Sequence, residues 1–234
     1  MAESAGSRFA GFPPEAFEFF EGLELENSKR YFTARRATYD GAVRGPLEAM
    51  LEELAAPVGG TVKMTRQNRD VRFSADKSPY KTRTYGVIAD RQGGTAPLYA
   101  QLSRAGLFAG SGYYGLARDQ LARFRDAVLD PVPGARLERA VADAHAAGIE
   151  TWGQTLRTAP RGISREHPRI ALLRHTLLIA GATREPKQTG ISRQAALDHA
   201  RRVWSAAAPV ADWLDANVGP SEDPPVSRDR GRRS

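Results

Sequence analysis

The spacing of apolar residues divides the chain into a helical part, a strand part and a second helical part. In the first part, apolar residues recur at the i, i+3, i+4, i+7 spacing of one helix face: Leu47, Met50, Leu51 and Leu54. Pro13 and Pro14 suit the start of a helix, because the first helical position needs no amide donor. Pro57 and the two glycines that follow it at 59 and 60 end this block. We therefore expect helices in the N-terminal third of the chain.

From about Thr61 the period changes to two, which is the period of a strand. Val71 and Phe73 alternate with three polar residues, Asp70, Arg72 and Ser74, so residues 66–74 are predicted to form a strand. Residues 81–89, 98–103 and 107–110 are predicted to form three more. Four strands with short connections indicate an antiparallel meander with one polar face.

The helical period then returns, with Ala117, Leu121, Phe124 and Val128 on one face. The last helix begins at Ser192, a good N-cap residue, and Pro209 should kink or split it. Residues 219–234 are rich in Pro, Ser and Arg and are expected to be disordered. The pattern thus predicts one α+β domain over residues 9–218. Its antiparallel meander sheet has about four or more strands, with helices before and after it, and the N-terminal residues 1–8 are flexible.

Composition narrows the class of protein. Of the 234 residues 41% are hydrophobic, which is enough for a core. The absence of cysteine excludes disulfides, thiolate zinc sites and a cysteine nucleophile. No run of 18 apolar residues occurs, so no membrane partner is expected and a cytoplasmic location is the default. No two of the four histidines lie within four residues of one another, so no metal site is predicted, and no cofactor is identified.

One motif resembles a phosphate-binding loop but lacks the required context. "GSGYYG" (110–115) satisfies G-x-G-x-x-G, follows a short strand and precedes a helix. A dinucleotide site needs a strand after that helix, whereas this chain continues with a loop and another helix. A glycine-rich exit from a sheet, where backbones approach closely, explains the motif better. Tyr113 is retained as a candidate wall of a pocket.

The strongest candidate for a functional region is the charged segment from Arg66 to Gly86. Its 21 residues include six cationic and only two anionic side chains, in a chain whose net charge is +7. Arginine binds phosphate or carboxylate with two parallel hydrogen bonds, and lysine adds a mobile positive charge. The predicted ligand-binding residues are Arg69, Asp70, Arg72, Ser74, Lys77, Tyr80, Lys81 and Tyr113. Asp76 is expected to accept hydrogen bonds from the turn that follows it.

The same residues carry a resemblance to a known family. The chain resembles the bacterial domain-of-unknown-function family 2461 from about Phe9 to Val218. The most specific stretch is "RDVRFSADKSPYKT" (69–82), and Tyr31 departs from the family pattern, where tryptophan is expected. The resemblance implies a single α+β domain and brings no reaction, cofactor or substrate with it. The matching stretch is mostly polar, which points to turn formation, to a ligand, or to both.

Three functional hypotheses remain open at this stage. The first is a pocket for a small anionic ligand, including phosphorylated ones. There the flanking arginines would lower the pKa of Asp70 and so favour binding over general-base catalysis by Asp70. The second is a nucleic-acid-binding module, which the lack of regular aromatic interleaving disfavours. The third is a structural or interaction protein, in which the charged segment only stabilises the fold and the function lies in a surface that binds a partner. Asp70 would then form an ion pair with its neighbours, and the charges would protect a sheet edge. Oligomeric state is not predicted.

Overall fold

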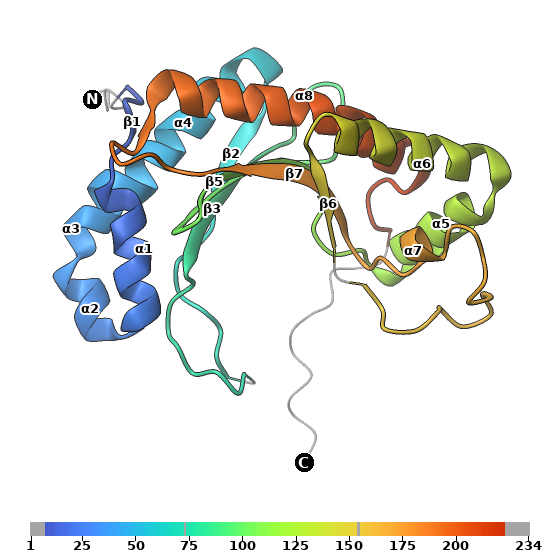
Figure 1. Cartoon of the computed structure of the whole chain (residues 1–234), viewed down its shortest axis with the longest axis horizontal. Coiled ribbons are helices and arrows are strands. Elements are labelled where there is room, and N and C mark those ends of the chain that lie inside the picture. Colours follow the sequence, from blue (N-terminus) through green and yellow to red (C-terminus); the bar gives the residue numbers. More distant parts are fainter. Residues whose placement is uncertain (1–7, 73, 154, 223–234) are drawn as a thin grey trace.

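The centre of the molecule is a six-stranded antiparallel sheet with the strand order β2–β3–β4–β5–β7–β6 (Figure 1). The computed structural model describes residues 8–72, 74–153 and 155–222. The strands are β2 (Thr61–Met64), β3 (Arg83–Ala89), β4 (Leu98–Ser103), β5 (Gly106–Tyr113), β6 (Glu150–Trp152) and β7 (Leu178–Arg184). Strands β2 to β5 follow one another as the predicted meander, and β7 and β6 extend it. The predicted α+β class is confirmed.

Short helices precede the sheet, and the first three of them lie at one side of it (Figure 1). They are α1 (Glu15–Leu25), α2 (Lys29–Ala34), α3 (Arg36–Thr38), the π-helix η1 (Tyr39–Arg44), α4 (Gly45–Ala55) and the 3₁₀ turn η2 (Ala56–Val58). A separate two-stranded ribbon pairs β1 (Gly11–Phe12) with β8 (Ile191–Ser192), which brings the start of the chain to the start of the last helix. The predicted apolar face, Leu47, Met50, Leu51 and Leu54, is buried.

The later helices lie at the other side of the sheet and across one of its faces. They are α5 (Arg118–Leu129), α6 (Pro131–Ala146), α7 (Ile170–Leu173) and α8 (Arg193–Asn217). Helices α4 and α8 cover the same face: α4 contacts β2, β3 and β4, and α8 contacts β5 and β7 (Figure 1). The group α5–α7 packs beside the far end of α8.

Strands β3 and β4 alternate between buried and exposed or partly exposed residues, whereas most residues of β5 and β7 are buried. The side chains beneath α4 and α8 are almost completely buried, and they include Ile88, Ala100, Leu102, Leu107, Ala109 and Ala180. Burying one leucine or isoleucine contributes about 1.5–3 kcal/mol, so this layer is a main source of stability. The intervening residues of β3 and β4 remain partly exposed on the opposite face. Within the described part of the chain, the helices α4 and α8 cover one face of the sheet and leave the other uncovered.

Helix α8 begins as predicted and runs through Pro209 without a break. The Ser192 hydroxyl accepts a hydrogen bond from the amide of Ala195 at 3.4 Å, which is the N-cap contact. Pro209 lies on the exposed side of the helix. Ser205, whose carbonyl has no amide donor at Pro209, is exposed as well, and the predicted split does not occur.

The end of the described chain is held against α5. Arg123 donates to the carbonyl of Pro220 at 2.7 Å, and Asp119 accepts from the Ser221 hydroxyl and the Glu222 amide, both at 2.8 Å. Residues 219–222 of the expected disordered tail are thus bound to the domain. Residues 223–234 and residues 1–7 of the expected flexible N-terminus lie outside the described residues.

The prediction of a strand over residues 66–74 is wrong. Residues 65–82, called the 65–82 loop below, connect β2 to β3 and extend away from the sheet (Figure 1). One isolated bridge, Asn68 to Tyr80, interrupts the irregular backbone among the described residues of this loop. Phe73, one of the two apolar residues on which the prediction rested, lies outside the described residues. Two backbone bonds cross the loop, from the Arg69 amide to the Pro79 carbonyl at 2.8 Å and from the Lys81 amide to the Gln67 carbonyl at 3.0 Å. Polar side chains bind other backbone groups, so a period of two in polarity did not imply a strand.

The contact between α8 and β7 predicts a dependence of stability on pH. The imidazole Nε2 of His199 lies 3.1 Å from the carbonyl oxygen of Ala182, and the ring is buried. Burial lowers the pKa of His199, and the charges of Arg202 and Arg184 lower it further. Below about pH 6.5 the unfolded chain therefore binds a proton that the folded chain resists, and the free energy of unfolding falls.

We expect the thermal midpoint of the wild type to fall more between neutral pH and about pH 5 than that of His199→Gln, which lacks this titration. His145→Gln, which changes an exposed histidine on α6, is the matched control and should behave as wild type. Equal pH profiles for all three proteins would contradict the assignment.

Candidate functional site

The 65–82 loop is held together by polar side chains that pair with backbone groups. The side chain of Gln67 is buried, and its Oε1 accepts from the hydroxyls of Thr84 at 2.7 Å and Tyr39 at 3.3 Å. Its Nε2 donates to the carbonyl of Lys81. The amide of Lys81 donates in return to the carbonyl of Gln67 at 3.0 Å. The Gln67 side chain therefore provides hydrogen-bond partners at the point where the regular pairing of β2 and β3 stops.

Asn27 fastens the other arm of the loop to the turn between α1 and α2. Its Nδ2 donates to the carbonyl of Tyr80 at 2.9 Å, and its Oδ1 accepts from the amide of Tyr80 at 3.1 Å. The Tyr80 ring is buried and stacks on Phe32, with ring centroids 4.2 Å apart. Tyr80, a predicted ligand-binding residue, is thus part of the core that joins the loop to the first helices.

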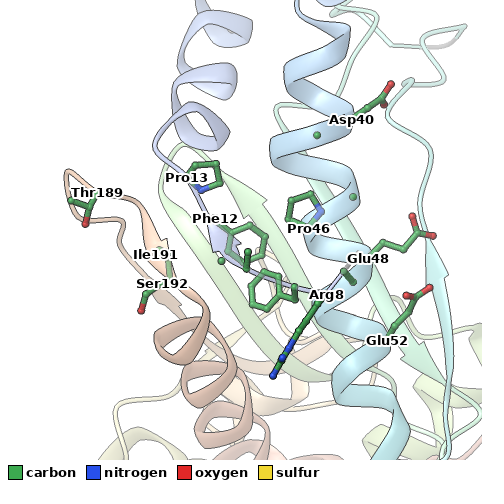
Figure 2. Close-up of a pocket in the computed structure, with 16 residues that line it drawn as sticks. Arg8, Phe12, Pro13, Asp40, Pro46, Glu48, Glu52, Thr189, Ile191 and Ser192 are labelled. Carbon is green, nitrogen blue, oxygen red and sulfur yellow. The ribbon is translucent and has the colours of Figure 1, made fainter. Parts of the chain in front are cut away.

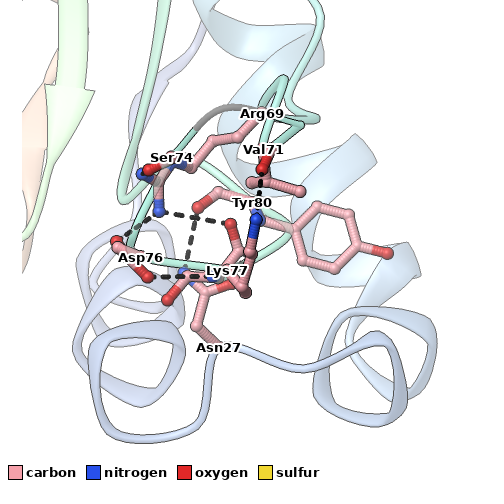
Figure 3. A network of polar contacts seen from close by, with 8 residues as sticks. Asn27, Arg69, Val71, Ser74, Asp76, Lys77 and Tyr80 are labelled. Carbon is pink, nitrogen blue, oxygen red and sulfur yellow. Dashed lines mark hydrogen bonds and ion pairs between the residues drawn. The ribbon is translucent and has the colours of Figure 1, made fainter.

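Arg69 is the centre of the network at the tip of the loop (Figure 3). Its Nη1 is paired with the carboxylate of Asp76 and donates to the carbonyl of Ser78 at 3.2 Å, and its Nη2 lies 3.5 Å from the Ser74 hydroxyl. Asp76 also accepts from the amide of Ser78 at 2.9 Å, as the sequence predicts for this turn. Hydrogen bonds from Ser78 and Arg69 lower the pKa of Asp76 to about 2. Arg69 and Ser74 therefore serve the loop itself.

The remaining charges of the loop tip also have partners within it. Arg72 binds Asp70 with two parallel hydrogen bonds, at 3.0 Å from Nε and 2.8 Å from Nη2. These bonds lower the pKa of Asp70 to about 2, so Asp70 is an unsuitable base. Lys77 donates through Nζ to the carbonyl of Val71 at 3.0 Å. Arg72 keeps 72% of its side chain exposed, so this pair adds little to stability.

Tyr113 lies on the face of the sheet that α8 covers, away from the 65–82 loop. Its hydroxyl hydrogen-bonds to Asp215 at 2.8 Å and to the Thr95 hydroxyl at 2.7 Å. Asp215 also accepts from the amides of Thr95 and Ala96, so one carboxylate ties the β3–β4 connection to α8. Burial raises the pKa of Tyr113 to about 12, and the bond to Asp215 acts in the same direction. Tyr113 does not join the other predicted residues.

Three of the eight predicted residues do share a hollow. Arg69, Tyr80 and Lys81 line a cavity of about 370 Å³ together with Glu24, Asp76 and Arg83. Its two acids are already paired, Asp76 with Arg69 and Glu24 with Arg104 at 2.8 Å. Lys81 and Arg83 are its only lining cations without an acidic partner among the described residues. The positive charge of the segment is therefore balanced at the tip of the loop and unbalanced at its base.

A cationic cluster of Arg66, Lys81 and Arg83 lies at this base. Within the described part of the chain, none of the three forms an ion pair. Lys81 Nζ donates to the carbonyl of Arg66 at 2.7 Å and lies 5.1 Å from the centre of the Tyr85 ring. Burial lowers the pKa of Lys81, and the charges of Arg66 and Arg83 lower it further. A neighbouring anion would relieve this repulsion.

Next to the cluster, aromatic side chains gather on the uncovered face of the sheet. This aromatic face consists of Tyr85, Tyr99, Phe108, Tyr114 and Trp152. They line a cavity of about 310 Å³, and Arg83 lines it too. Tyr114 and Trp152 keep 62% and 47% of their surface exposed, which is unusual for residues of this size. Tyr99 is more enclosed, and burial raises its pKa to about 12.

Two glycines allow the Phe108 ring to lie flat against the sheet. A Cβ at Gly181 would stand 2.4 Å from a carbon of this ring, and one at Gly110 would stand 2.8 Å from the same carbon. The ring then meets Trp152 edge to face, with centroids 5.8 Å apart. The glycine at 110 is the first of the "GSGYYG" motif, and Gly110 and Gly112 also approach the backbone of β7 closely, whereas Gly115 does not. The motif thus shapes the floor of the aromatic face.

A larger hollow of about 750 Å³ lies between the N-terminal segment and α4 (Figure 2). Its polar residues do not converge. The carboxylates of Asp40, Glu48 and Glu52 lie on the side of the helix away from Thr189 and Ser192 (Figure 2). Asp40 is also paired with Arg36 at 2.6 Å. Volume alone does not make a binding site, and the smaller cavity on the sheet has the better chemistry.

Sequence reasoning missed the aromatic face because its members are far apart in the chain. Tyr85, Tyr99 and Phe108 lie on three consecutive strands, whereas Trp152 lies on β6, which joins the sheet through β7. The available signal was that Tyr85 and Tyr99 each occupy the partly exposed phase of an alternating strand, whereas β5, which carries Phe108, does not alternate. The objection that the strands lack aromatic interleaving does not hold for the folded sheet.

The fold and the site define a single α+β domain whose antiparallel sheet is covered by helices on one face and lined with aromatic side chains on the other. The chain belongs to the family described as conserved hypothetical protein (DUF2461), whose model matches residues 15–213. No curated protein matches the chain. Among the described helices, none combines the length and the apolar character needed to cross a bilayer.

The bond pair between Asn27 and Tyr80 generates a prediction about the loop. Asn27→Ala removes both partners of a partly buried amide and carbonyl, which should lower the free energy of unfolding by about 1–3 kcal/mol. Asn27→Asp keeps the acceptor and loses the donor, so it should lower the free energy of unfolding by at least the contribution of one hydrogen bond. Urea denaturation monitored by circular dichroism measures both.

Arg72→Ala is the control for this pair of variants, because it removes an exposed ion pair from the same loop and should cost less than about 1 kcal/mol. If Arg72→Ala destabilised the protein more than Asn27→Ala, the loop would depend on its charges and not on its bonds to Tyr80.

Proposed function

We propose that this protein binds a small anionic ligand with a flat apolar body, phosphorylated compounds included, on the open face of its sheet. The observation that carries the proposal is the position of Arg83, which lines both the aromatic cavity and the hollow that contains Lys81. A ligand whose ring lies on the aromatic face would therefore have its charged group beside the cationic cluster.

The size and lining of the aromatic cavity support the binding of a small molecule. About 310 Å³ lies at the lower end of the range for ligand pockets, and such pockets combine an apolar lining with a few polar groups. Trp and Tyr faces stack well on flat rings, and Tyr85, Tyr99 and Trp152 come from three different strands. Gln101 and Thr183 add hydrogen-bonding groups to the same wall.

The charge distribution supports the binding of an anionic group at one end of the aromatic cavity, beside the cationic cluster. Arg69 and Arg72 are neutralised by Asp76 and Asp70, whereas Arg66, Lys81 and Arg83 have no acidic partner among the described residues. The proposal thus retains Lys81 from the residues predicted by sequence. It transfers the role of Arg69 and Arg72 to Arg83 and Arg66.

Single-stranded nucleic acid is the second candidate, because successive bases stack on aromatic platforms of this kind. The one-sided position of the cations disfavours it, since a strand places a phosphate beside every base. The two candidates differ in their salt dependence. Each phosphate contact on a single strand contributes a log–log slope of about −0.7, so a strand that crosses the face should lose affinity steeply with salt.

Phenyl phosphate is a suitable probe because it joins a ring to an anion. Of the three tryptophans, Trp204 and Trp213 are buried and Trp152 lies on the aromatic face, so quenching of tryptophan fluorescence reports on the site. We expect phenyl phosphate to quench the wild type, and Arg83→Ala to weaken binding about tenfold or more, the value of one charged hydrogen bond.

Arg72→Ala is the matched control, since it removes an arginine that is already paired. It should bind phenyl phosphate as the wild type does, and inorganic phosphate or phenol alone should bind more weakly than the joined compound. Equal affinities in Arg83→Ala and wild type would contradict the proposal. Tighter binding of an oligonucleotide, with a slope that indicates several phosphates, would favour the second candidate.

A further inference from the structure

Two polar side chains on the uncovered face of the sheet have no partner in the protein. Gln101 on β4 and Thr183 on β7 line the aromatic cavity, and within the described part of the chain neither side chain forms a hydrogen bond. Ser103 lines the same cavity but differs, because its hydroxyl accepts from the amide of Ala105 at 3.3 Å. The Gln101 amide therefore offers two donor hydrogens and an acceptor oxygen to a ligand.

The register of the strands places Gln101 among aromatic side chains. Gln101 lies directly opposite Tyr85 on β3 and opposite Phe108 on β5, and Tyr99 precedes it by two residues on the same face. Phe108 lies in turn opposite Thr183, so the two polar residues stand on either side of it. Residues opposite each other on antiparallel strands have Cβ atoms about 4.5–5.5 Å apart. A flat group stacked on these rings would therefore have the Gln101 amide within reach of its edge.

The register also sets the distance from Gln101 to the cationic cluster. Arg83 lies opposite Ser103, which follows Gln101 by two residues on the same face of β4. Diagonal neighbours of this kind lie about 7–8 Å apart. A ligand that reaches both Arg83 and Gln101 thus needs a short spacer between its anionic group and its flat ring. The sugar of a nucleotide is a spacer of this kind.

We propose that the ligand is a nucleoside monophosphate whose adenine base stacks on the aromatic face and pairs with the amide of Gln101. This inference rests on the proposed function and names the ligand class of that site. The phosphate would lie at Arg83, which also lines the hollow that contains Lys81. Adenine presents an amino donor beside a ring-nitrogen acceptor, and a glutamine amide binds this pair with two parallel hydrogen bonds. Its flat face suits stacking on aromatic side chains.

Adenosine 5′-monophosphate is the probe, and isothermal titration calorimetry of the whole chain measures its affinity. Purine riboside 5′-monophosphate is the matched ligand, because it lacks only the amino group of adenine. A site that hydrogen-bonds a group on its ligand discriminates against the analogue without that group. We expect the wild type to bind the adenosine compound about tenfold more tightly than the analogue. Ribose 5-phosphate, which has no base, should bind more weakly than either.

Gln101→Leu keeps the approximate size of the side chain and removes its amide. In this variant the ratio of the two affinities should fall close to one, because the amino group no longer meets an acceptor. Gln194→Leu is the matched control, since Gln194 lies on α8 and its amide donates to Asp198 at 2.7 Å. It should keep the ratio of the wild type. The comparison of the two ligands in the wild type tests the pairing without any variant.

The outcomes distinguish this inference from the proposed function. Equal affinities of the wild type for the adenosine compound and its analogue would overturn the inference, and quenching by phenyl phosphate would then leave the proposed function intact. An unchanged ratio of affinities in Gln101→Leu would also overturn the inference. If neither adenosine 5′-monophosphate nor phenyl phosphate bound to the wild type, both proposals would be overturned.

Discussion

The burial of one face of the six-stranded sheet beneath α4 and α8 is the interaction on which the rest of the structure depends. Because side chains alternate along each strand, the residues that fill this core leave their neighbours on the opposite face. The helices that do not cover the sheet lie at its two sides, so no described helix covers the opposite face (Figure 1). That face carries Tyr85, Tyr99, Phe108 and Trp152, which places large aromatic surfaces where a ligand can reach them.

The polar stretch that identifies the family has a structural explanation in most of its length. An irregular loop of this size has backbone donors and acceptors that no strand ladder satisfies, and each buried group without a partner costs stability. Gln67 and Asn27 meet this need at the base of the loop, and Arg69 and Asp76 meet it at the tip (Figure 3). Charged residues are therefore compatible with a role in shaping the loop as well as in binding.

The difference between paired and unpaired cations decides where an anion is best accommodated. A guanidinium that already holds a carboxylate with two hydrogen bonds, such as Arg72, offers little to a second anion. Where Arg66, Lys81 and Arg83 stand together, their mutual repulsion is relieved when an anion binds, so charge and geometry favour the same location. The aromatic cavity begins at that location, because Arg83 lines both hollows.

The sequence by itself determined the class of the fold, the meander, the buried helix faces, the Ser192 cap and the turn at Asp76. These features follow from local periodicity and from side chains that bind backbone two or three residues away. Only the tertiary structure decided which cations are paired, that Tyr80 and Tyr113 are buried away from the open face, and that Trp152 joins the tyrosines of distant strands. Those contacts depend on strand order and on links such as Asn27 to Tyr80, 53 residues apart. A period of two reports the polarity of a segment, but the partner of each side chain is set by which segments the packed core brings together.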